Sequence, residues 1–267
     1  MRRPGRAAVG VVCLRPVHVV VVFTAAFVAG AINSVAGGGT LVSVPTLIWV
    51  GVPALDANAT STVGLWPGSL GSVWGYRREL STADRRLFAL VVPSLAGGLL
   101  GAVLLRLTPS DLFERILPFL ILFATLLFMA QEPIQRRFNL AALHDARSHW
   151  LSWTMLFQFL VGVYGGYFGA GIGILMLAAL SLMGHSDIHQ MNGVKNLLAV
   201  CVNGIAAVYL AFFSMLVLWT DALTMAGGAV LGGIASAGMA RRLGRLAVRR
   251  IVIAIGLAMT LSMMFGL

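Results

Sequence analysis

Apolar segments long enough to cross a lipid bilayer follow one another through most of this 267-residue chain. Several approach the roughly 20 residues that a helix needs to span the hydrocarbon core of a membrane. Only 10% of the residues are charged, whereas soluble domains carry roughly 25%. We therefore expect an all-α, polytopic integral membrane protein. Its apolar segments are expected at 17–34, 40–51, 58–76, 87–105, 113–130, 150–167, 172–184, 191–213, 218–240 and 251–266.

The basic residues lie mainly in the short connectors between these segments. Arginine accounts for all but one of the 19 lysine and arginine residues, and the formal net charge is +10. Arginine clusters beside apolar helices are typical of cytoplasmic loops that face anionic lipid headgroups. We therefore expect the lipid bilayer as a partner and no nucleic acid.

The sequence does not indicate chemistry that depends on cysteine, a metal or a catalytic group. Cys13 and Cys201 lie far apart and form no CxxC motif. His185 and His189 are four residues apart but have no third metal ligand. No nucleophile stands beside a base. We predict no catalytic residue, no metal site and no cofactor, so the protein is not expected to be an enzyme.

A basic tail at 1–16 and the first apolar segment together mimic a secretory signal peptide. Arg2, Arg3 and Arg6 precede the apolar run, and small residues at 29–31 resemble a cleavage site. The run continues into a glycine-rich stretch that recurs later in the chain, which a discarded peptide would not need. We therefore expect this segment to be retained as the first membrane segment.

The two halves of the chain resemble each other. Ala96-Gly97-Gly98 recurs 130 residues later as Ala226-Gly227-Gly228, and a polar stretch at 131–149 divides the chain almost in half. This duplication predicts a first transmembrane repeat at 17–130, an inter-repeat linker at 131–149 and a second repeat at 150–267. Further residues recur at an offset of 132, with Phe27, Gly30, Gly37 and Gly39 matched by Phe159, Gly162, Gly169 and Gly171.

The arginine bias changes sides between the halves, as expected of inverted repeats. The connector at 77–86 is arginine-rich and its counterpart at 213–220 has no basic residue, whereas 106–112 and 241–250 show the opposite bias. Each inverted repeat must cross the membrane an odd number of times. We therefore expect a broken, re-entrant-type helix pair plus about three transmembrane helices in each repeat, with the arginine-rich connectors in the cytoplasm. The side of the N-terminal tail stays open.

Glycine-rich breaks stand at corresponding places in the two halves. The first is Ala36-Gly37-Gly38-Gly39 with Pro45 after it, and the second spans 165–173. A helix break at membrane depth must face protein or a water-filled cavity, and a helix that restarts there presents N–H groups to an anion. We interpret both breaks as parts of a binding site. Six other glycines are interpreted as helix-packing positions, namely Gly97, Gly98, Gly101, Gly227, Gly228 and Gly232.

Lys195, the single lysine, stands near the start of an apolar helix. Such a charge is costly and usually faces a cavity or partner, so it could balance an anionic substrate. Alternatively, its side chain could extend to the membrane interface. Asn196 and Asn203 are two helical turns apart and form a polar strip beside it. In the first half, Thr60 and Ser61 could either cap a helix or donate hydrogen bonds to a ligand.

A small anionic substrate is therefore expected at the two breaks. Asp56, Asp187 and Asp221 lie at predicted helix edges, so no buried carboxylate is expected to couple transport to an ion. The candidate substrate contacts are Asn33, Gly37, Gly38, Gly39, Thr40, Thr60, Ser61, Gly169, Gly171, Gly173, Lys195, Asn196 and Asn203.

At these residues the sequence resembles the TauE/SafE sulfite exporter family of membrane transporters. The resemblance covers nearly the whole chain, from about 17 to 266. In the first half it is carried by Gly30, Ala36-Gly37-Gly38-Gly39, Pro45 and Ala59-Thr60-Ser61, and in the second by Gly162, Gly169, Gly171, Gly173, Asn192-Gly193-Val194-Lys195 and Asn203. One position departs from the family pattern, because the second repeat often has a threonine where this chain has Val194.

The resemblance implies a secondary transporter that exports small sulfur-containing anions, such as sulfite or organosulfonates, across the bacterial inner membrane. Alternating access would come from movement of one repeat against the other. The alternatives are an anion channel and a carrier of a non-sulfur organic anion. Whether the protein forms a homo-oligomer is left open.

Overall fold

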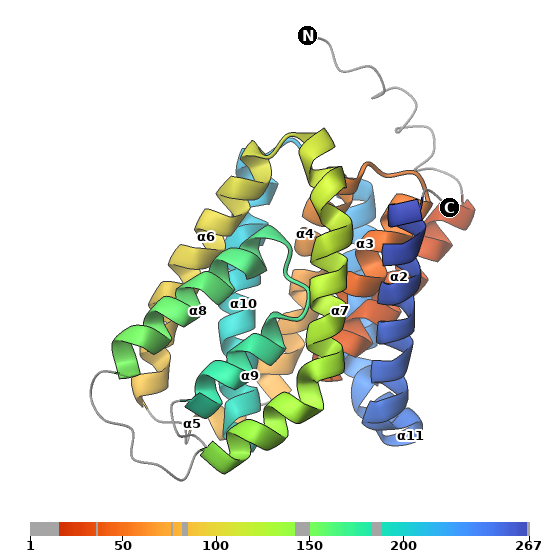
Figure 1. The fold of residues 1–267 in the computed structure, drawn as a ribbon. Coiled ribbons are helices and arrows are strands. Elements are labelled where there is room, and N and C mark those ends of the chain that lie inside the picture. The colour runs from red at the N-terminus through yellow and green to blue at the C-terminus, as the bar shows by residue number, and fades with distance from the viewer. Residues whose placement is uncertain are drawn as a thin grey trace.

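The computed structural model describes residues 16–35, 37–75, 77–81, 85–141, 150–182 and 188–265, which form helices and connecting turns but no strand. Residues 1–15 of the predicted tail and 142–149 of the predicted linker lie outside the described residues. In chain order the elements are α2 (Pro16–Val35), α3 (Thr40–Trp49), α4 (Ala54–Gly75), α5 (Arg77–Ser81), the 3-10 helix η1 (Arg85–Leu90), α6 (Val91–Leu107), α7 (Ser110–Ala141), α8 (Trp150–Tyr167), α9 (Ile172–Leu182), α10 (Ile188–Phe213) and α11 (Trp219–Phe265) (Figure 1).

The helices have the length and surface of membrane-spanning segments. Large apolar side chains such as Val92, Phe119 and Leu160 are exposed on the helix surfaces, which suits contact with lipid. The prediction of an all-α, polytopic membrane protein is confirmed. Within the described residues, four helical segments are long and apolar enough to cross a membrane, namely Pro16–Ser34, Leu87–Leu107, Ser110–Ala130 and Gln190–Phe213.

Two helices run further than the sequence predicted. α7 continues to Ala141, through half of the predicted linker. α11 runs from Trp219 to Phe265 because the expected connector at 241–250 is itself helical; its arginines and leucines are strong helix formers. A straight helix of 47 residues would be about 70 Å long, over twice the hydrocarbon thickness of ~30 Å. Figure 1 shows that α11 instead folds back on itself, so that its two limbs lie within the bundle.

Each half of the chain begins with a helix, a glycine turn and a second, shorter helix. α2 leads to α3 through a turn that contains Gly37 (φ 78°), and α8 leads to α9 through Gly169 (φ 83°) and Gly171 (φ 77°). Residues with a side chain rarely adopt these positive φ angles, so the breaks lie at the predicted glycines. Pro45 lies inside α3 and does not end it.

The two glycine turns meet inside the bundle. A β-carbon added to Gly37 would lie 3.8 Å from the Cα atom of Gly173. In Figure 1, α8 and α9 rise from the end of the bundle at which α5 lies and return to it, whereas α2 begins at the other end. Two hairpins that enter from opposite ends are what inverted repeats would produce. The inverted-repeat interpretation itself stays a prediction.

Backbone contact through glycines joins α2 to the first limb of α11. Gly228 packs against the carbonyl of Phe23, and Gly232 packs against the carbonyl of Phe27. Gly30 on α2 packs in the same way against Ala229. A side chain at any of these glycines would overlap the facing backbone, so the two helices are held at the closest distance that helices can reach.

A second seam of the same kind joins α6 to α8. Gly97 and Gly101 on α6 pack against the carbonyls of Phe159 and Val163, and Gly166 on α8 packs against the carbonyl of Gly98. The broken hairpin of each half therefore packs on a helix of the other half. This divides the molecule into an α2 group (α2, α3, α4 and the first limb of α11) and an α8 group (α6, α8, α9 and α10).

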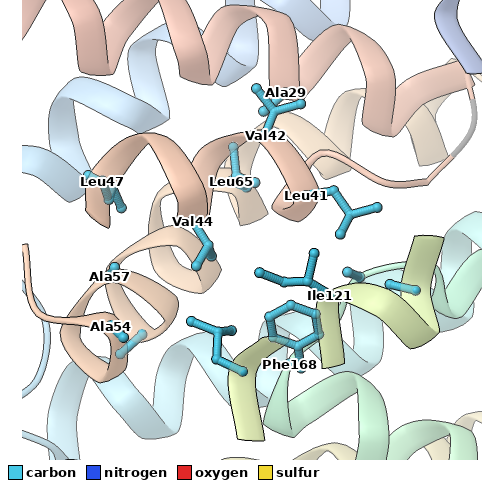
Figure 2. Packing of buried hydrophobic residues seen from close by; sticks show 14 of the residues in the cluster. Ala29, Leu41, Val42, Val44, Leu47, Ala54, Ala57, Leu65, Ile121 and Phe168 are labelled. Atoms are coloured by element: carbon cyan, nitrogen blue, oxygen red, sulfur yellow. The ribbon is translucent and has the colours of Figure 1, made fainter. Parts of the chain in front are cut away.

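The largest apolar core surrounds the short helix α3. Figure 2 shows Leu41, Val42, Val44 and Leu47 of α3 among buried residues of α2, α4 and α7 and beside Phe168 of the turn after α8. Burial on all sides explains how a helix of 10 residues, too short to span a bilayer, is stable at membrane depth. The core thereby holds the first glycine turn in place.

The glycine seams predict a sharp difference between two neighbouring glycines of α11. Gly232→Ala places a methyl group on the Phe27 carbonyl, and such overpacking typically costs about 1–3 kcal/mol. Gly227→Ala is the matched control, because Gly227 is exposed and the nearest atom, Phe23 Cε2, is 3.7 Å away. We expect Gly232→Ala to lower the melting temperature of the purified protein and Gly227→Ala to leave it unchanged or higher. Equal melting temperatures would contradict the seam.

The predicted packing role thus holds for five of the six glycines and is wrong for Gly227. Gly97, Gly98, Gly101, Gly228 and Gly232 each face the backbone of another helix, whereas Gly227 faces outward.

Candidate functional site

A polar cavity lies where the two glycine turns meet, between the α2 group and the α8 group. Its volume of about 40 Å³ gives room for about three water molecules. Residues of both hairpins line it, together with residues of α4 and α10. They are Asn33, Gly37, Thr40 and Ser69 from the α2 group and Gly169, Ile172, Gly173, Lys195, Asn196, Ala199 and Asn203 from the α8 group.

Asn33 shapes the first turn and also lines the cavity. Its Oδ1 atom accepts a hydrogen bond from the Gly39 backbone N–H (3.1 Å). The N–H of Gly37 donates to the carbonyls of Ile32 (3.2 Å) and Asn33 (3.1 Å). These bonds satisfy backbone groups that the helix break would leave unpaired. Thr40, the first residue of α3, then lies at the cavity wall.

Lys195 lines the cavity from α10 and is only 5% exposed. This is not the position of a lysine that extends to the membrane interface, so the cavity-facing alternative holds. Its Nζ atom donates to Asn192 Oδ1 over 3.4 Å. Its aliphatic chain rests on Gly173, where an added β-carbon would lie 3.3 Å from Lys195 Cδ. The glycine of the second break therefore makes room for the lysine.

Two asparagines flank Lys195 on α10. Asn196 is 7% exposed, and its Nδ2 atom has no hydrogen-bond partner within the described part of the chain. A buried donor without an acceptor is costly, so this amide is suited to an acceptor brought by a ligand. Asn203 lies two turns further along and also lines the cavity.

A smaller chamber of about 10 Å³ adjoins the cavity. Asn33, Thr40, Ser69, Gly169 and Asn203 belong to both. The residues that line only the smaller chamber are partly apolar and partly hydroxyl-bearing. They are Ser61, Thr62, Leu65, Trp66 and Phe168.

Four predicted contacts lie away from both spaces. Gly38 packs on the ring of Phe128, and Gly39 packs on the carbonyl of Ala29. Gly171 packs on Leu127 and Ala124 of α7. Thr60 is fully buried, and its Oγ1 atom accepts a hydrogen bond from the Leu218 N–H (3.0 Å). These residues support the walls of the site without lining it.

The alternative that Thr60 and Ser61 cap a helix is wrong. α4 begins at Ala54, so both residues lie inside the helix, where no unpaired N–H group needs a cap. The Ser61 hydroxyl instead shares a hydrogen bond of 2.6 Å with Ser43 of α3 and lines the smaller chamber.

The sequence did not single out Ser69, Ile172 or Ala199 as wall residues. A signal for two of them was present in the helical spacing. Ser69 follows Thr62 by seven residues, and Ala199 stands four residues from both Lys195 and Asn203, so each shares a helix face with a polar residue of the site.

Val194 does not face the cavity. It is 1% exposed and packs in a separate apolar cluster with residues such as Leu90 and Val161. The departure from the family pattern at this position therefore removes no hydroxyl from the cavity walls.

The charge of the cavity favours an anion. Lys195 is the only ionisable residue among the lining residues of either space, and hydroxyl and amide groups supply the other polar contacts. A buried ammonium group attracts an opposite charge, because Coulomb attraction is stronger inside a protein than in bulk water. The geometry therefore provides an ammonium group, amides and hydroxyls around a space that fits a few heavy atoms.

The expectation that no carboxylate is buried is wrong. Asp221 lies in the first turn of α11, at a helix edge as predicted, but it is buried, and its Oδ1 atom lies 2.9 Å from Nε2 of His18. This pair could not be predicted from the sequence, because the two residues are 203 positions apart. His185 and Asp187 lie outside the described residues.

An all-helical membrane bundle with a polar cavity between two broken hairpins defines a protein of the membrane transporter class. The chain belongs to the sulfite exporter TauE/SafE family, whose model matches residues 22–263. This bears out the resemblance seen in the glycine motifs. No solved structure matches the chain.

Curated relatives cover nearly the full length of the chain. A probable membrane transporter protein, ORF9, of Sinorhizobium sp is 29% identical over 91% of this chain and 90% of its own length. A probable membrane transporter protein of Haemophilus influenzae is 28% identical over 92% of this chain and 94% of its own. The probable membrane transporter protein YfcA of Escherichia coli K12 is 26% identical over 94% and 91%. The chain is thus a membrane transporter.

The bond between Asn33 and Gly39 predicts how the first turn responds to substitution. Asn33→Leu removes the acceptor, so we expect faster hydrogen–deuterium exchange at residues 37–43. Asn33→Asp is the matched control, because its carboxylate still accepts from the Gly39 N–H. Unchanged exchange in Asn33→Leu would show that Asn33 does not hold the turn.

Proposed function

We propose that the protein is a secondary transporter that exports small sulfur-containing oxyanions, such as sulfite or organosulfonates, across the inner membrane. The observation that carries the proposal is the buried Lys195 beside the unpaired amide of Asn196 in a cavity whose lining residues include no carboxylate. The TauE/SafE family membership supports the sulfur-containing substrate.

An oxyanion matches these groups in charge and in hydrogen bonding. Its negative charge would compensate the Lys195 ammonium group, and its oxygens would accept from Asn196 Nδ2 and the Thr40 and Ser69 hydroxyls. Hydrogen bonds between ionised and neutral partners are stronger than those between neutral groups. The volume of about 40 Å³ suits the headgroup of such an anion and not a large organic ligand.

The adjoining chamber, with a volume of about 10 Å³, offers space for about one methyl-sized group of a short sulfonate. Leu65, Trp66 and Phe168 give it apolar walls, next to hydroxyls of Ser61 and Thr62. A sulfonate group beside Lys195 would point a short carbon chain toward these residues. Sulfite would occupy the larger cavity alone.

The packing suggests which helices move during transport. The cavity separates the α2 group from the α8 group, and each group is joined internally by glycine seams. Contacts between the groups include side chains that reach backbone carbonyls, with Asn58 Nδ2 donating to the Tyr167 carbonyl (2.8 Å) and Trp66 Nε1 donating to the Val200 carbonyl (3.2 Å). We therefore propose that alternating access comes from movement of the α2 group relative to the α8 group. Each group contains helices from both halves of the chain, so the moving parts are not the two repeats.

Binding can be tested with a panel of small anions and purified protein. We expect sulfite or a short sulfonate to raise the melting temperature of the wild type, since a ligand at about 100 times its Kd stabilises by about 2.7 kcal/mol. Lys195→Ala should abolish the shift because it removes the counter-charge. Arg115→Ala, which removes an exposed cation of α7, is the matched control and should keep it.

Flux measurements in proteoliposomes then separate a carrier from a channel. In a carrier, anion flux saturates as the substrate concentration rises and is accelerated by substrate on the opposite side of the membrane. In Lys195→Ala, we expect neither the saturable flux nor its acceleration. Normal anion flux in Lys195→Ala would remove the lysine from the site. In the binding experiment, a shift in melting temperature with carboxylates or phosphate alone would show that the substrate belongs to another anion class than the sulfur oxyanions.

A further inference from the structure

A buried histidine–aspartate pair joins the two halves of the chain far from the anion cavity. His18 lies in the first turn of α2, and Asp221 lies in the first turn of α11. His18 Nε2 is 2.9 Å from Asp221 Oδ1, and the two side chains are 4% and 2% exposed. Of the carboxylates whose side chains the structure describes, Asp221 alone is buried.

Such a pair is expensive to maintain within a membrane protein. Burying an imidazole and a carboxylate costs solvation free energy that their attraction only partly returns. Apolar residues would pack the same α2–α11 seam at lower cost, as the buried Val22 and Ala26 do about one and two turns further along α2. Ionisable residues kept inside membrane helices commonly serve ion or proton movement.

The geometry of His18 gives the pair one place to take up a proton. With Nε2–H donating to Asp221, the other ring nitrogen, Nδ1, carries the lone pair of a neutral imidazole. This atom is buried and has no hydrogen-bond partner among the described residues. A proton added at Nδ1 converts neutral His18 beside ionised Asp221, net charge −1, into an imidazolium–carboxylate pair with no net charge. Loss of that proton restores the first state.

Two elements connect the pair to the anion site. α2 runs from His18 to Asn33 at the cavity wall, 15 residues or about 22 Å along the helix. The first turn of α11 is held to α4, because the N–H of Leu218 donates to Thr60 Oγ1 (3.0 Å). The next residue of α4, Ser61, lines the smaller chamber. A change of charge at the pair therefore acts on two helices that form the site.

We propose that His18 and Asp221 form a proton-binding site whose protonation is coupled to anion transport. This rests on the proposed anion carrier function. Among the elements packed against the pair, α3 carries no ionisable residue, α4 carries Asp56, and the near end of α7 carries Asp111, Glu114 and Arg115. The arginines of α11 lie at 241–250, where the helix folds back at the other end of the bundle.

The coupling is tested in proteoliposomes with methanesulfonate, which stays a monoanion throughout the working range, so any proton movement is due to the protein. Flux of the labelled anion and the internal pH, from a trapped dye, are recorded together. We expect wild-type protein to move protons with the anion. In His18→Gln and Asp221→Asn, proton movement per transported anion should fall to zero once the proton leak of protein-free liposomes is subtracted. Asp111→Asn, an exposed carboxylate of α7, is the matched control and should retain the wild-type ratio.

Proton binding at the pair is also tested without any substrate. The melting temperature of wild type and His18→Gln is compared across about pH 5–8, where an imidazole titrates, and we expect the two pH profiles to differ. Identical profiles would overturn the proton site. Anion flux without proton flux in the wild type would overturn the coupling and leave the carrier function standing. Absence of flux with methanesulfonate and every other anion of the panel would overturn both.

Discussion

The two helix breaks are possible at membrane depth only because protein groups take the place of water around them. A bilayer offers no hydrogen bonds to an unwound backbone. Here Asn33 accepts from the Gly39 N–H, Asn58 donates to the Tyr167 carbonyl, and the Tyr164 hydroxyl donates to the Ala170 carbonyl (2.8 Å). Each of these side chains must be held by a neighbouring helix or by its own hairpin. The packing of the whole bundle follows from that requirement.

Glycine serves two different purposes in this arrangement. At Gly37 and Gly169 it permits the positive φ angles of the turns. At Gly101 and Gly232 it permits backbone contact between helices. The second purpose fixes each broken hairpin on a helix from the other half of the chain. Each of the two packed groups thereby combines helices from both halves of the chain, and the polar cavity lies at the boundary between the groups.

These two purposes explain what could be predicted from the sequence. The breaks were predictable because consecutive glycines in an apolar run conflict with a regular helix, and Lys195 was predictable because a single charge in such a run has few tolerable positions. The partner helix of each seam was not predictable, since Gly227 and Gly232 look alike in sequence and only Gly232 meets the backbone of α2. Thr60 was assigned to the site by its residue type, although its hydroxyl is engaged by the Leu218 N–H.

The His18–Asp221 pair could not be found from the sequence for a related reason. A residue near a helix end can be solvated or buried, and only the neighbouring helix decides which. The first turn of α2 packs beside the first turn of α11, and the two side chains are enclosed between them. Neither segment alone indicates this packing.

The choice of lysine at the cavity fits a site that must release what it binds. Every other cation outside the histidines is an arginine, so the chain uses lysine at one position only, and that position is the cavity. Arginine would offer a planar fork that grips two oxygens of an oxyanion, whereas lysine offers a compact charge without that fixed geometry. The neutral asparagines and hydroxyls around Lys195 add hydrogen bonds without adding charge. An anion carrier of the kind proposed would gain from this balance, because each of its transport cycles would end with the anion returning to water, and a site that held the anion too firmly would slow that step.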